Sequence, residues 1–146
     1  VATTDGGMSL YATADTGARL KHAWTQAMSD KPFFSSPCTV LDREGALCGL
    51  IASHDGHLRL FDAIKGTIRW GESTNNLAQF ASPCLLFPDI CVSATVAGDV
   101  VVSNMSDGQV LARVRLPGEV FSSPVCVGNC VYVGCRDDRL YCLEFK

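Results

Sequence analysis

This chain of 146 residues lacks three features: a large excess of charge of either sign, long apolar runs and helical periodicity. Twelve basic residues face 15 acidic ones, for a net charge of −3, which excludes the basic surface that nucleic-acid binding needs. The longest apolar runs are about the length of a strand, well short of the ~18 residues of a transmembrane helix. No stretch carries a sustained i, i+3, i+4, i+7 apolar stripe, so we expect almost no helix. The chain starts at Val1 with no signal-peptide pattern, and we expect it to be part of a larger protein.

Catalytic and metal-binding patterns are also missing. The sequence has no G-x-S-x-G elbow, no C-x-x-C pair, no Cys/His/Asp set and no candidate calcium cluster, and its acidic residues lie mostly at turns. His22, His54 and His57 lack the spacing of metal ligands on one face, and we expect His54 and His57 to be solvated beside the turn at Asp55. We therefore predict no catalytic, cofactor-binding or metal-binding residue in this chain.

What the sequence does contain is a repeat. The Ser-Pro anchors are Phe34-Ser35-Ser36-Pro37, Phe80-Ala81-Ser82-Pro83 and Phe121-Ser122-Ser123-Pro124, and their prolines lie 46 and 41 residues apart. After each anchor, short Val/Leu/Ile/Tyr/Phe runs alternate with Gly- and Asp-containing turns, which is typical of strands joined by hairpins. Four short strands in about 40–45 residues is the period of a propeller blade.

The repeat predicts an all-β fold, specifically a partial β-propeller of four-stranded antiparallel blades that forms an open fragment of a larger ring. Residues 33–78 and 79–119 are predicted to form whole blades. Residues 1–32 carry the third and fourth strands of a preceding blade, with a turn at Thr16-Gly17, and residues 120–146 supply the first three strands of a last one. Closed propellers have about 4–8 blades, so we expect the open blade faces to pair with further blades or with a second copy.

Individual blades resemble the pyrroloquinoline-quinone-type repeats of quinoprotein-dehydrogenase-like propellers. The residues that carry this resemblance are Leu10-Tyr11-Ala12 with Thr16-Gly17, and Asp55-Gly56 with Leu60-Phe61-Asp62-Ala63, Gly66 and Trp70. The last segment is similar to the C-terminal propeller of the animal β-alanine-activating enzymes, a family of adenylate-forming ligases in the acyl-CoA synthetase class. That similarity lies in Pro117-Gly118-Glu119-Val120-Phe121-Ser122-Ser123-Pro124-Val125, Gly134-Cys135-Arg136-Asp137 and Tyr141-Cys142-Leu143.

The tryptophans and the anchor serines have both a structural and a functional interpretation. Trp24 and Trp70 fall in fourth-strand positions, which favours packing between blades over stacking on a planar cofactor. Ala112 stands where a third tryptophan would complete the pattern. The anchor serines begin the innermost strands, where their hydroxyls either bond loop backbone or line a ligand site at the mouth of the channel. These are Ser35, Ser36, Ser82, Ser122 and Ser123.

The eight cysteines are predicted to be free structural thiols. One repeat column holds Cys48, Cys91 and Cys130, and another holds Cys38, Cys84 and Val125. A position that accepts either Cys or Val behaves as a small buried hydrophobic residue. Unpaired thiols suit a reducing compartment, so we expect a cytoplasmic protein.

The ligase resemblance implies a non-catalytic C-terminal module that serves as a docking or ligand-binding platform. The parent would use ATP, Mg²⁺ and phosphopantetheine, and the partners of the module would be the remaining blades and the adenylation and carrier domains. Two alternatives stay open. One is a fragment of a quinoprotein dehydrogenase that binds pyrroloquinoline quinone, although this chain has no adjacent cysteine pair and we expect no cofactor in it. The other is an interaction scaffold of the WD type.

Overall fold

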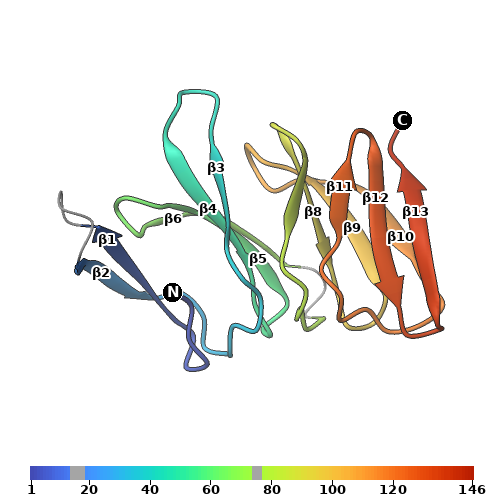
Figure 1. Ribbon diagram of the computed structural model, residues 1–146, viewed down its shortest axis with the longest axis horizontal. Coiled ribbons are helices and arrows are strands. Elements are labelled where there is room, and N and C mark those ends of the chain that lie inside the picture. Colours follow the sequence, from blue (N-terminus) through green and yellow to red (C-terminus); the bar gives the residue numbers. More distant parts are fainter. Residues whose placement is uncertain (14–18, 74–76) are drawn as a thin grey trace.

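The computed structural model describes residues 1–13, 19–73 and 77–146, and these residues form antiparallel sheets that follow one another along the chain (Figure 1). Within those ranges there is no helix, and hence none long and apolar enough to cross a membrane. The fold class predicted from the repeat is confirmed. The predicted turn at Thr16-Gly17 lies outside the described residues.

Each sheet corresponds to one blade or part of one, in the order in which the repeat places it. The first sheet is a hairpin, the second and third have four strands in sequential order, and the last has three. Their strands are β1 (Gly7–Thr13) and β2 (Leu20–Ala27); β3 (Cys38–Leu41), β4 (Leu47–Ala52), β5 (His57–Asp62) and β6 (Ile68–Ser73); β7 (Cys84–Phe87), β8 (Ile90–Ala94), β9 (Asp99–Asn104) and β10 (Val110–Arg115); and β11 (Val125–Val127), β12 (Cys130–Cys135) and β13 (Arg139–Glu144). The residue boundaries proposed above for the blades stay a prediction.

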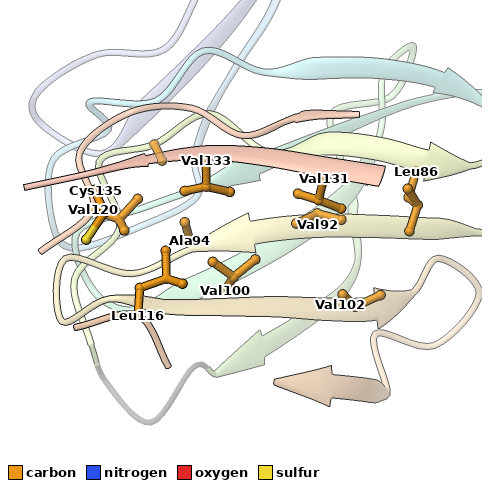
Figure 2. Close-up of a cluster of buried hydrophobic side chains, with 11 residues drawn as sticks. Leu86, Val92, Ala94, Val100, Val102, Leu116, Val120, Val131, Val133 and Cys135 are labelled. Atoms are coloured by element: carbon orange, nitrogen blue, oxygen red, sulfur yellow. The ribbon is translucent and has the colours of Figure 1, made fainter. Parts of the chain in front are cut away.

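The hydrophobic core lies between successive sheets, because side chains alternate across each strand and both faces of a middle sheet are covered. In β4, Ile51 points toward the first sheet, as does Phe61 of β5. Leu50 points the other way, toward the third sheet, where it packs in one cluster with Met105. The third and fourth sheets enclose the largest cluster, in which Val131 and Val133 of β12 lie over Val92 and Val100 (Figure 2). A single blade could not bury these faces alone, so its stability depends on its neighbours.

Two tryptophans join neighbouring sheets, as the sequence predicted. Trp24 donates its indole N–H to the carbonyl of Ala63 at 3.2 Å, and Trp70 donates to the carbonyl of Met105 at 2.9 Å. Both acceptors directly follow the third strand of the next sheet. Each indole therefore bridges two blades at the same place in the repeat.

The third tryptophan position is held by Ala112, and this distinguishes the last interface. The strand register shows that the three positions are equivalent. Trp24 pairs with Leu10 and Trp70 pairs with Leu60, and Ala112 pairs in the same way with Val102. At this interface Phe145, which follows β13 as Met105 follows β9, packs against the cluster that includes Ala112. The third and fourth sheets are thus joined by apolar packing without an indole hydrogen bond.

Glycine is required where an indole lies on a turn. Gly108 has a φ of +78°, and a β-carbon there would lie 2.8 Å from the ring of Trp70. We expect Gly108→Ala to lower the free energy of unfolding by about 2–3 kcal/mol, because left-handed strain adds to the displacement of the ring. Urea denaturation followed by circular dichroism measures this loss.

The control for Gly108→Ala is Gly45→Ala. Gly45 has a φ of +81°, but nothing lies within 4 Å of the place that a β-carbon would take there, so this variant carries the backbone strain alone and should lose only about 1 kcal/mol. Equal losses in the two variants would show that the contact with Trp70 contributes nothing.

Candidate functional site

The Ser-Pro anchors are brought together on one side of the molecule, along the lower edge of the view in Figure 1. In the first and third anchors, the first serine bonds within its own sheet. Ser35 donates its hydroxyl to the carbonyl of Ala52 at 2.6 Å, and Ser122 donates to the carbonyl of Gly134 at 2.7 Å. Both acceptors lie on the second strand of the sheet that follows the anchor. These hydroxyls fasten the start of each blade, which is the structural role considered from the sequence.

The second serines form a ladder from one blade to the next. The backbone N–H of Ser36 donates to the hydroxyl of Ser82 at 2.8 Å, and the backbone N–H of Ser82 donates to the hydroxyl of Ser123 at 2.9 Å. Each step crosses one blade interface. The hydroxyls of Ser35, Ser82, Ser122 and Ser123 thus bond to backbone, which favours the structural interpretation of the anchors over a ligand site built from serine hydroxyls.

The phenylalanine of each anchor is the feature that the sequence interpretation missed. The rings of Phe34 and Phe80 stack, with centroids 4.6 Å apart and planes 8° apart, and Phe121 follows at 5.4 Å from Phe80. We call these three residues the aromatic row. Phe34 is 49% and Phe121 41% exposed, so the row presents apolar surface to solvent at the entrance of three successive blades.

Two polar side chains border the aromatic row. The ring of His54 lies roughly perpendicular to those of Phe34 and Phe80, at centroid distances of 5.9 and 5.1 Å. The guanidinium carbon of Arg136 lies 5.4 Å from the centre of Phe121. The expectation that His54 is solvated was wrong in part, because the rings of the row shield much of its imidazole from water. Stacked rings bordered by polar side chains make a surface suited to an apolar or planar ligand group.

The signal that could have identified the row is its position in the repeat. Phe34, Phe80 and Phe121 each stand three residues before the anchor proline. An equivalent position in neighbouring blades lies at an equivalent place in space, so identical residues there are adjacent. None of the three phenylalanines belongs to the buried core, since Phe34 and Phe121 are exposed and Phe80 is half-buried.

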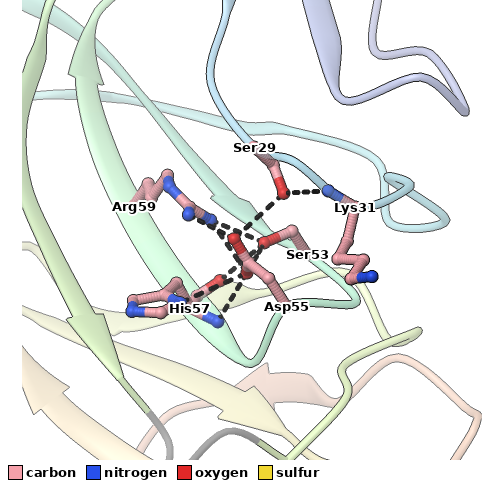
Figure 3. A network of polar contacts seen from close by, with 6 residues as sticks. All are labelled: Ser29, Lys31, Ser53, Asp55, His57 and Arg59. Atoms are coloured by element: carbon pink, nitrogen blue, oxygen red, sulfur yellow. Dashed lines mark hydrogen bonds and ion pairs between the residues drawn. The ribbon is translucent and has the colours of Figure 1, made fainter.

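A polar network holds the turn beside the row, at Asp55 (Figure 3). The Asp55 carboxylate accepts hydrogen bonds from the Ser29 hydroxyl at 2.9 Å, from the His57 amide at 2.9 Å, and from Ser53 and Arg59. Burial alone raises the pKa of Asp55, but the bonds from Arg59, Ser53 and the His57 amide outweigh it and hold the pKa well below its usual range. The imidazole of His57 also lies beside this network, with its Nδ1 3.4 Å from Oδ1 of Asp55. The expectation that His57 is solvated was therefore wrong in part.

A hollow of about 280 Å³ between the second and third sheets is a weaker candidate. Both arginines of its lining are paired, because Arg43 binds Asp89 at 2.6 Å and Arg69 binds Asp42 at 2.6 Å. Arginines already engaged by carboxylates offer little charge to a ligand. The aromatic row is therefore the better candidate for a binding surface.

The cysteines fall into environments that the repeat columns predicted only in part. Cys48 and Cys91 are fully buried, as expected. Cys38 and Cys84 are half-buried, and Val125 of the same column is 57% exposed, so this column is not a core position. All eight cysteines lie among the described residues, and each is a free thiol there.

Comparison with known proteins places the fold among repeat propellers. Residues 54–146 match the family described as outer membrane protein assembly factor BamB. The crystal structure of BamB from Moraxella catarrhalis superposes with a TM-score of 0.76 at 19% identity, covering 98% of this chain and 40% of that one. The computationally designed Ika4 protein gives a TM-score of 0.79 at 15% identity, covering 99% of this chain and 83% of that one.

Curated relatives share more sequence. The β-alanine-activating enzyme of Danio rerio is 36% identical over 116 residues, or 75% of this chain and 10% of the relative. The β-alanine-activating enzyme of Drosophila melanogaster is 32% identical over 132 residues, or 84% of this chain and 13% of the relative. This chain therefore spans only about a tenth of the length of the relatives that it matches.

Proposed function

Since this chain belongs to the propeller-repeat family described as outer membrane protein assembly factor BamB and has relatives among the β-alanine-activating enzymes, we propose that it is the non-catalytic propeller module of an adenylate-forming ligase. Other parts of that protein would activate the amino acid with ATP and Mg²⁺ and receive it on phosphopantetheine. The remaining blades would complete the ring. A cytoplasmic location fits its eight free thiols.

The observation that carries a docking role is the aromatic row. Three rings in contact, two of them more than 40% exposed, lie on the loops that enter successive blades. Aromatic residues, phenylalanine among them, are enriched in protein interfaces, and loops positioned by a rigid scaffold commonly carry binding residues. The serine ladder and the Asp55 network fix the loops from which the rings project. We propose that the row is the contact surface for the loaded carrier arm.

The experiment compares the full-length protein, the same protein without its propeller, and a Phe34→Ala/Phe121→Ala variant. We expect the rate of ATP–pyrophosphate exchange with β-alanine to stay within about twofold in all three. The yield of β-alanine bound to the carrier should fall severalfold in the second and third, because the row would no longer hold the arm.

An Ile64→Ala variant is the control, because Ile64 is 64% exposed and lies outside the row. It should match the wild type in both assays. Loss of exchange activity on removal of the propeller would contradict a non-catalytic role. Unchanged loading of the carrier in the Phe34→Ala/Phe121→Ala variant would contradict docking at the row.

A further inference from the structure

Two thiols from neighbouring blades meet between the third and fourth sheets. The Sγ atoms of Cys84, at the start of β7, and Cys126, in β11, lie 3.0 Å apart. A disulfide bond is about 2.05 Å long, so a shift of about 1 Å would join them. The two residues are 42 positions apart in sequence and share no motif, which is why sequence patterns do not reveal the pair.

We propose that Cys84 and Cys126 form a reversible disulfide that ties the third blade to the fourth. The location supports this assignment independently of the sulfur distance. The two preceding interfaces are each bridged by an indole hydrogen bond, from Trp24 and Trp70, whereas Ala112 leaves this one without such a bridge. A covalent bond between β7 and β11 would fasten the interface that lacks the tryptophan. The inference does not depend on the proposed function.

The chemistry is thiol–disulfide exchange with a small disulfide such as glutathione disulfide. A hydrogen bond from Cys84 lowers the pKa of Cys126 against the effect of burial, and the same bond and burial raise the pKa of Cys84. Cys126 is therefore the first nucleophile. Its thiolate attacks one sulfur of the glutathione disulfide and expels one glutathione thiolate, which takes up a proton.

The second step closes the bond. Cys84 loses its proton to solvent, and its thiolate attacks the Cys126 sulfur of the mixed disulfide and expels the second glutathione. Two protein thiols are thereby oxidised while one glutathione disulfide is reduced to two glutathione molecules. Dithiothreitol would reduce the Cys84–Cys126 bond back to two thiols and would itself be oxidised to its cyclic disulfide. The contact between β7 and β11 keeps the attacking sulfur beside its target.

The test exposes the full chain to glutathione disulfide, blocks the remaining thiols, and maps linked peptides by mass spectrometry without reduction. We expect a linkage that joins the peptides containing Cys84 and Cys126, and its loss in Cys84→Ser and in Cys126→Ser. Cys38→Ser and Cys130→Ser are the controls. Cys38 lies at the start of β3 and Cys130 at the start of β12, and both thiols are half-buried. Both variants should leave the linkage intact.

The oxidised chain should also melt higher than the reduced chain by on the order of 10 °C, since the bond closes a loop of about forty residues. That rise should be absent in Cys84→Ser. A stable glutathione adduct at Cys126 with no linkage, a linkage that persists in Cys84→Ser, or no reaction at either thiol would overturn the proposal.

Discussion

Replacing Trp70 by alanine is expected to lower the free energy of unfolding by about 3 kcal/mol. The indole joins two sheets by a hydrogen bond to Met105, and its ring covers the turn at Gly108. Alanine would remove both contacts and leave a cavity at the interface of the second and third blades. Denaturation in urea, followed by circular dichroism, measures the loss.

Two control variants separate the parts of this effect. Trp70→Phe retains most of the ring packing and should lose about 1–2 kcal/mol, because only the hydrogen bond and part of the area are removed. Ile68→Ala changes an exposed residue of the same strand and should stay within about 0.5 kcal/mol of the wild type. A loss below about 1 kcal/mol for Trp70→Ala would show that the indole does not hold the blades together.

Replacing Asp55 by alanine should destabilise the fold by a similar amount, about 3 kcal/mol. The carboxylate is 10% exposed and its partner Arg59 is 11% exposed. The substitution therefore leaves a buried guanidinium without its counter-charge, although its hydrogen bond to the Ser53 hydroxyl remains, and it removes the acceptor of the Ser29 hydroxyl and the His57 amide. The matched control is Asp89→Ala. It breaks the pair with Arg43, in which the Asp89 and Arg43 side chains are 46% and 77% exposed, and should have a much smaller effect than Asp55→Ala.

The contribution of Asp55 also has a defined pH dependence. Because the pKa of its carboxyl is lower in the folded protein than in the unfolded chain, the folded state favours the ionised form. This stabilisation is fully present above the unfolded pKa of about 3.9 and is lost as the pH falls through the folded pKa. The difference in unfolding free energy between the wild type and Asp55→Asn should therefore shrink below about pH 4. A difference that stays constant from neutral pH down to about pH 3 would contradict it.

The repeat explains how much of this structure could be predicted. Anchors at fixed spacing, with hairpin turns between them, indicated four-stranded blades, and the register of Trp24 and Trp70 indicated contacts between blades. These features are local, because a turn residue or an apolar strand favours the same backbone structure in every blade. The aromatic row could have been predicted by the same logic from the position of Phe34, Phe80 and Phe121 in the repeat.

Other features depend on the distance between blades, which spacing does not encode. The environment of His54 arises because two rings from different anchors enclose it. The Asp55 network needs Ser29 from the segment before the anchor as well as Arg59 from the next strand. The meeting of Cys84 with Cys126 joins different columns of the repeat, so no alignment of one blade on another would pair them.

The sequence by itself determined the blades, their order and the absence of any recognised catalytic pattern, because period, turn chemistry and alternation act over a few residues. The tertiary structure alone decided the contacts between side chains that occupy different positions of the repeat. That choice depends on the angle and separation at which packed sheets meet, which the combined volume of buried side chains sets across each interface. The enclosure of His54 by two rings, the contact of Ser29 with Asp55 and the thiol pair are products of that packing.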